Sequence, residues 1–135
     1  MTRGKLAEKI PTVLLVDDEP AWLELISMAL EKESYKVITA DSGENALMKM
    51  HKKTPDLILS DVRMPFMNGF DLFEKVRNDP KLKSVPYVFM SSLDDYDAKR
   101  VAKELGVDDY VAKPFDTEEV KSIVLNLLTR FKEKH

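Results

Sequence analysis

Five short apolar runs, separated by longer stretches with helical spacing, constrain the fold of this chain more than any other feature. The runs are rich in β-branched and aromatic residues, and we expect them to be strands: Val13–Val16, Val37–Ala40, Leu57–Ser60, Tyr87–Met90 and Tyr110–Ala112. Strands that alternate with helices form a parallel sheet, because the chain must cross back before each new strand. The pattern therefore predicts an α/β fold: a single doubly wound domain of three layers, with helices on both faces of a five-stranded parallel sheet.

The stretches between these runs carry residues that begin and end helices. Ser42 is a suitable N-cap, and Gly106 lies where a helix C-terminal glycine is expected. The expected helices cover about 22–30, 42–50, 70–78, 95–105 and 116–132. We expect one tryptophan and four methionines to fill the core, namely Trp22, Met28, Met48, Met50 and Met90.

The composition is that of one ordinary globular domain. The 135 residues are 44% hydrophobic and 33% charged and include no cysteine, so disulfides are excluded and a reducing cytoplasm is expected. The formal net charge of −3 argues against general affinity for nucleic acid. No run approaches the roughly 18 apolar residues that a membrane span needs. We therefore expect a cytoplasmic protein that binds neither nucleic acid nor a membrane directly.

Polar residues follow four of the five expected strands. Asp17, Asp61, Ser91 and Lys113 lie at or just past the ends of the first, third, fourth and fifth strands. Each alone has an ordinary explanation: the acids could cap a helix or form a turn, the serine could be a loop hydroxyl, and the lysine a solvated charge. In a doubly wound sheet, however, ligands bind beyond the carboxyl ends of the strands. Together, these residues predict one polar site.

The chemistry of such a site follows from its residue types. Asp17, Asp18 and Asp61 would repel one another unless a cation lay among them. Mg²⁺ prefers hard oxygen ligands and often binds one or two carboxylates together with phosphate oxygens. A carboxylate can also attack phosphorus to give an acyl phosphate, while Lys113 and the Ser91 hydroxyl neutralise the transferring oxygens. The pattern indicates a divalent-metal site that is phosphorylated on Asp61.

At this point the residues resemble a known family, the receiver domains of bacterial two-component response regulators. The matching segments are VDDE at 16–19, DVRMPFMNG at 61–69, PYVFMS at 86–91 and GVDDYVAKPF at 106–115. The resemblance implies a flavodoxin-like sheet with strand order 2-1-3-4-5. It covers a receiver domain at 12–131, preceded by an N-terminal extension at 1–11 and followed by a C-terminal tail at 132–135.

The resemblance also implies a role for each residue of the site. Asp61 would accept a phosphoryl group from a sensor histidine kinase, a phosphotransfer protein or a small donor such as acetyl phosphate. Mg²⁺ would bind Asp17, Asp18, Asp61 and the Val62 backbone carbonyl. Lys113 would pair with the phosphoryl group, and its bond to Pro114 is expected to be cis. Such a domain is a phosphoacceptor switch that assists its own phosphorylation, and is not a classical enzyme.

Switching and lifetime are implied in the same way. The Ser91 hydroxyl would bind the phosphoryl group and Tyr110 would turn inward, altering a surface of the fourth helix, fifth strand and fifth helix, about 94–105 and 110–128. That surface would bind an output partner or a second copy of the chain. Arg63 and Leu93 occupy positions that tune the phosphoryl lifetime, and neither is the acid or amide that positions an attacking water. We therefore expect slow loss of phosphate.

Two other functions remain open from the sequence. A phosphate-independent interaction module, or pseudo-receiver, could use the same fold, although such modules often lose one of the site residues that are all present here. A magnesium-dependent aspartyl phosphohydrolase places its nucleophile after the first strand, whereas the best nucleophile here, Asp61, follows the third. Turnover of a phosphomonoester would distinguish such an enzyme from a receiver.

Overall fold

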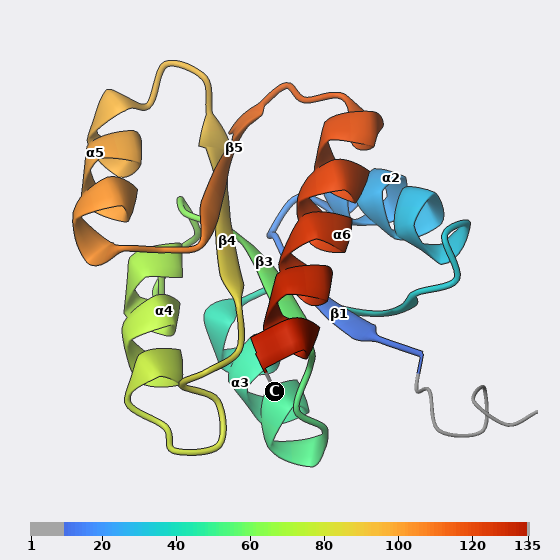
Figure 1. The fold of residues 1–135 in the computed structure, drawn as a ribbon. Coiled ribbons are helices and arrows are strands. Elements are labelled where there is room, and N and C mark those ends of the chain that lie inside the picture. Colours follow the sequence, from blue (N-terminus) through green and yellow to red (C-terminus); the bar gives the residue numbers. More distant parts are fainter. Residues whose placement is uncertain (1–9, 135) are drawn as a thin grey trace, which may run out of the picture.

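The computed structural model describes residues 10–134, with side chains to residue 131, and forms a three-layer α/β sandwich (Figure 1). Its elements in chain order are β1 (Thr12–Val16), α2 (Pro20–Glu31), β2 (Lys36–Ala40), α3 (Gly43–Lys52), β3 (Leu57–Asp61), α4 (Gly69–Arg77), β4 (Tyr87–Ser92), α5 (Tyr96–Leu105), β5 (Asp109–Lys113) and α6 (Thr117–Lys134). All strand pairs are parallel, in the order β2-β1-β3-β4-β5. The expected fold class and strand order are confirmed.

The sheet is buried on both faces because its side chains alternate between two cores. Leu14, Val16 and Ile58 point to the core shared with α3, α4 and α5. Val13 and Leu57 point to the other core, shared with α2 and α6. Figure 1 shows α2 and α6 together on one side of the sheet and α3, α4 and α5 on the other. The continuous apolar strands of the sequence thus have the physical cause expected for a parallel sheet.

Local signals in the sequence place the helix ends. The Ser42 side chain accepts a hydrogen bond from the Asn45 N–H at the start of α3, as expected of an N-cap. Asp95 caps α5, and Gly106 ends it with a φ of 72°, a left-handed conformation that suits glycine. The last helix, α6, runs on to Lys134 and so includes residues 132–134 of the expected C-terminal tail. Residues 1–9 of the expected extension and His135 of the tail lie outside the described residues.

Strand register brings the polar residues to one edge of the sheet. Three strands extend beyond their expected carboxyl ends to site residues or one residue past them: β3 to Asp61, β4 to Ser92 and β5 to Lys113. Asp61 lies beside Met90, and Ser92 lies beside Lys113. Because neighbouring parallel strands end together, residues far apart in the sequence converge here.

Two of the expected core methionines are not in the core. Met50 and Met90 are buried, but Met28 is 55% exposed and Met48 is 54% exposed. Both lie on the outer faces of amphipathic helices, where spacing alone did not separate them from the buried stripe. Trp22 is also not core filler, because its half-buried side chain lines the polar pocket. Among residues 10–134, no helix has the length and apolar character needed to cross a bilayer.

Candidate functional site

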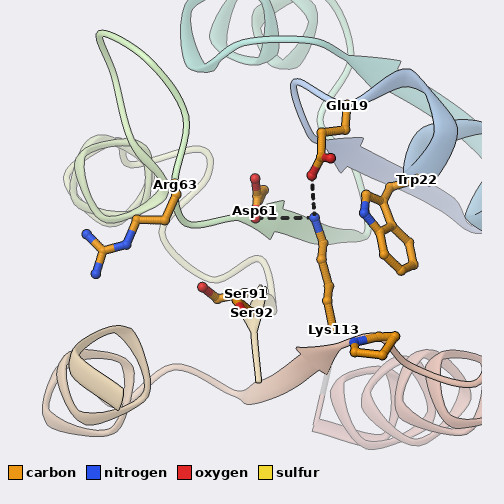
Figure 2. A pocket seen from close by; sticks show the side chains of 8 residues that line it. Glu19, Trp22, Asp61, Arg63, Ser91, Ser92 and Lys113 are labelled. Carbon is orange, nitrogen blue, oxygen red and sulfur yellow. Dashed lines mark hydrogen bonds and ion pairs between the residues drawn. The ribbon is translucent and has the colours of Figure 1, made fainter. Parts of the chain in front are cut away.

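Lys113 lies among three carboxylates at the carboxyl edge of the sheet. Its Nζ atom is 2.7 Å from Asp17 Oδ2. It is also 3.4 Å from Asp61 Oδ1 and 3.6 Å from Glu19 Oε1, the two contacts that Figure 2 shows. Asp17 is fully buried and Asp61 is 5% exposed. The Lys113–Pro114 peptide bond is cis, as expected. The structure thus brings together Asp17, Asp61 and Lys113, which the sequence placed on three different strands.

The pKa values of Asp17, Asp61 and Lys113 are shifted because two carboxylates are buried beside a single lysine. Burial and, next, the nearby Asp17 carboxylate together raise the pKa of Asp61 from 3.8 to about 7, against the attraction of Lys113. Burial also raises the pKa of Asp17, although hydrogen bonds from Lys113 and from the Glu19 N–H oppose the change. Burial alone would lower the pKa of Lys113, but its hydrogen bond to Asp17 and the charge of Asp61 outweigh burial and raise it. Lys113 therefore remains a cation and only partly balances the two acids.

The acids form a group that fits a divalent cation. One carboxylate oxygen from each of Asp17, Asp18, Glu19 and Asp61 lies within 4.8 Å of the others. Two of these acids are buried and two are exposed, so the group opens to solvent on one side. Hard oxygen donors of this kind suit Mg²⁺, which keeps several waters of its own. Because the carboxylates of Asp61 and Asp17 repel one another, a further positive charge between them would stabilise both in their ionised form.

The hydroxyl of Ser91 is buried near these acids but bonds elsewhere. Ser91 Oγ donates to Asp95 Oδ2 at 3.0 Å, and the Arg63 guanidinium donates to the same carboxylate. Tyr110 is half-buried on β5, where it pairs with Phe89 of β4. Burial raises the pKa of its phenol, and a hydrogen bond with the Ser91 side chain opposes that rise. Among the hydrogen bonds of the described residues, Ser91 makes none to Asp61. The Ser91 hydroxyl thus lies in the same pocket as Asp61, but it is hydrogen-bonded to Asp95.

Comparison with protein families matches residues 13–125 to the response regulator receiver domain. The chain belongs to the response regulator receiver family. The chemotaxis protein CheY4 of Vibrio cholerae has the same fold with a TM-score of 0.78 and 32% identity over 91% of this chain and 99% of that one. A response regulator receiver protein from Pseudomonas putida gives a TM-score of 0.81 at 26% identity, covering 88% of this chain and 98% of that structure.

Longer proteins contain related receivers. The alkaline phosphatase synthesis transcriptional regulatory protein PhoP of Bacillus subtilis is 37% identical over 118 residues, which is 87% of this chain and 48% of PhoP. The chain spans about half the length of the curated relatives it matches. These matches therefore identify the chain as a receiver domain. The activity of a whole relative is a property of that longer protein and is not assigned to this chain.

Three further residues that the sequence assigned to the site are Val62, Leu93 and Arg63. The Val62 carbonyl, expected as a metal ligand, accepts a hydrogen bond from the Gly69 N–H at 2.8 Å, so metal binding there would need its second lone pair. Leu93 is 70% exposed and is not among the residues that line the pocket. Arg63 does line it, but its guanidinium points away from Asp61 (Figure 2).

Three side chains at the site were missed from sequence. Glu19 extends the acid group, and its position directly after Asp17-Asp18 is the signal that could have found it. The Trp22 ring lies 5.0 Å from Lys113 Nζ and 4.8 Å from the Phe115 ring, forming an aromatic wall of the pocket. In the sequence, Asp95 indicates only the start of a helix. Its hydrogen bonds with Arg63, in the loop after β3, could not be predicted from the spacing of residues.

Proposed function

We propose that this receiver accepts a phosphoryl group on Asp61 in a magnesium-dependent reaction. The observation that carries the proposal is the placement of a nearly buried Asp61 beside Lys113 and the acids that flank it. A phosphohistidine of a sensor histidine kinase or phosphotransfer protein is the proposed donor, with acetyl phosphate as a small substitute. A cytoplasmic location belongs to the same proposal, since the sequence has no cysteine.

The side chains divide the work of the transfer. An Asp61 oxygen would attack phosphorus as the bond from phosphorus to the donor nitrogen or oxygen breaks, and the leaving group keeps that bonding pair. Lys113, 3.4 Å from Asp61, is placed to neutralise an oxygen of the arriving group. Mg²⁺ held by Asp17, Asp18 and Asp61, with Glu19 in reach, would supply further positive charge at the same oxygens.

The same proposal includes an output surface on α5, β5 and α6. The Tyr110 phenol interacts with the Ser91 side chain between β5 and β4, so that movement of the hydroxyl toward a phosphoryl group would alter the packing of the ring. Tyr96, at the start of α5, is 77% exposed and offers an apolar contact to a partner. An output partner or a second receiver would bind there, and light scattering with and without phosphorylation tests the dimer.

Slow loss of phosphate also belongs to the proposal. A water that attacks the phosphoryl group needs an acid or amide to position it. Arg63 is a cation that donates through two of its nitrogens to Asp95, and Leu93 is an aliphatic residue outside the pocket lining. Neither side chain supplies that function, so the receiver is proposed as a switch with a long-lived signal.

Mass spectrometry of the intact protein tests the proposal directly. Incubation with acetyl phosphate and Mg²⁺ is expected to add one phosphoryl group, and chelation of the metal or the substitution Asp61→Asn is expected to abolish it. Asp41→Asn is a matched control, because Asp41 is an exposed acid that follows β2 at the same sheet edge but lies outside the acid group. It should leave the adduct intact.

Two outcomes would contradict the proposal. A folded protein that forms no adduct with either donor would be a phosphate-independent interaction module. Repeated hydrolysis of a phosphomonoester, such as p-nitrophenyl phosphate, would identify an aspartyl phosphohydrolase.

A further inference from the structure

Asp95 ties three segments of the chain to one carboxylate. Its Oδ2 accepts from Arg63 Nε at 2.7 Å and from Ser91 Oγ at 3.0 Å. Its Oδ1 accepts from Arg63 Nη2 at 2.9 Å and from the Ala98 N–H at 3.1 Å, which makes it the N-cap of α5. Each oxygen thus accepts two hydrogen bonds, so the carboxylate is fully used. The loop after β3, the end of β4 and the start of α5 all meet here.

These contacts determine which acceptor the Ser91 hydroxyl donates to. Ser91 is 1% exposed, and a hydroxyl has only one hydrogen to donate. While that hydrogen is directed to Asp95, it is not available to an oxygen on Asp61. Arg63 donates through two of its nitrogens to the same acid, so its charge is also directed away from Asp61. Two donors that flank Asp61 are therefore committed to Asp95.

We propose that Asp95 is a positioning residue that holds the Ser91 hydroxyl away from Asp61 until a phosphoryl group competes for it. The inference rests on the proposed phosphorylation of Asp61. The exchange replaces one hydrogen-bond acceptor of Ser91 by another, with no covalent bond formed or broken at Ser91 itself. Because Asp95 also caps α5, the exchange changes the contacts of a residue at the first turn of that helix.

Arg63 strengthens the hold. The hydrogen bond from Arg63 keeps the pKa of the Asp95 carboxyl well below its usual range, and the Ala98 N–H and Ser91 hydroxyl add to this. The acceptor is therefore charged at neutral pH, and hydrogen bonds to charged acceptors are stronger than those to neutral ones. A phosphoryl group must outcompete this acceptor, so Asp95 sets how readily the receiver responds.

Binding of beryllofluoride, a phosphoryl mimic, with Mg²⁺ tests the inference in the intact chain. Trp22 lies in the pocket and provides a fluorescence signal, with calorimetry as a second measure. Asp95→Ser keeps a side chain that can cap α5 but removes the charged acceptor of Ser91. We expect about tenfold tighter binding of beryllofluoride, in line with the net contribution of one hydrogen bond to a charged group. The beryllofluoride affinity of Asp95→Asn should lie between that of the unsubstituted protein and that of Asp95→Ser.

The decisive comparison is the same substitution in a Ser91→Ala background. Asp95→Ser should then change the affinity by less than about twofold, because the residue acts through Ser91. Asp97→Ser is the matched control, since Asp97 is an acid of the same helix turn that pairs with Arg100. It should have little effect.

Three results would overturn the inference, and they are distinguishable from one another. An unchanged affinity in Asp95→Ser, with the variant shown to be folded by circular dichroism, would show that Asp95 does not restrain the hydroxyl. A gain that persists in the Ser91→Ala background would show a general effect of charge. Absence of beryllofluoride binding in the unsubstituted protein would remove the proposed function, and this inference with it.

Discussion

Replacing Asp61 by asparagine is expected to stabilise the magnesium-free protein, because it removes a nearly buried charge that one lysine does not fully balance. The pKa of Asp61 is raised from 3.8 to about 7 in the folded protein, first by burial and then by Asp17. Between these two values the folded protein keeps a proton that the unfolded chain has released. The free energy of unfolding therefore falls as pH rises through this window and stays low above pH 7.

The size of the effect follows from the same values. The rise from 3.8 to about 7 spans about three pH units, and each is worth about 1.4 kcal/mol, which gives an upper limit of about 4 kcal/mol at pH 8. Asp61→Asn also removes an attractive partner of Lys113, which reduces the gain. We expect a net stabilisation of about 2 kcal/mol at pH 8 and a much smaller one near pH 4, where the native carboxyl is already protonated.

Urea unfolding at pH 4 and pH 8, with a chelator present, measures this difference. Asp41→Asn is the matched control and should change stability little at either pH, because Asp41 is exposed. Added Mg²⁺ should then favour the unsubstituted protein, by about 2.7 kcal/mol at one hundred times its dissociation constant. If Asp61→Asn destabilised the protein at pH 8 without Mg²⁺, Lys113 would fully balance the two buried acids and this account of the site would be wrong.

Three other variants test the packing and chemistry of the site. Lys113→Met leaves the buried acids without their cation and should destabilise the protein by about 3 kcal/mol at pH 8, and by less at pH 5, in urea unfolding; equal losses would contradict this. Gly69→Ala would place a Cβ 2.3 Å from the Asp61 carbonyl oxygen, so a loss of about 2 kcal/mol or more is expected in thermal unfolding. Leu93→Glu combined with Arg63→Asn should speed loss of the phosphoryl group by about tenfold or more, measured by its decay in intact mass; an unchanged rate would remove the proposed cause of slow dephosphorylation.

The main features of the site could be predicted from sequence because they depend on local pattern and on strand ends. Apolar runs mark strands, and parallel strands end at a common edge, so Asp17, Asp61 and Lys113 were expected together before any contact was known. The order of the strands could not be derived in this way, because alternation of strands and helices does not specify which strands are neighbours. It came from resemblance to receivers, and the structure confirms it.

The rest could not be predicted because it depends on contacts between side chains far apart in the sequence. Arg63 and Asp95 are 32 residues apart, and each reads in sequence as an ordinary loop or helix-start charge. Trp22 fits the apolar spacing of α2, yet its place at the first turn brings it to the sheet edge beside Lys113. Exposure of Met28 was missed for a related reason, since helical spacing ranks faces and does not show where a neighbouring element stops covering them.

Locating the phosphoryl group tests the central claim most directly. After incubation with acetyl phosphate and Mg²⁺, borohydride reduces an aspartyl phosphate to homoserine, and the position is then read by tandem mass spectrometry. Trypsin should release residues 54–63, which contain both Asp56 and Asp61, so fragmentation must separate the two. We predict homoserine at position 61 and none at position 56. Modification at Asp56, at any other acid, or at no acid despite a phosphoryl adduct would contradict the assignment of Asp61 as the acceptor.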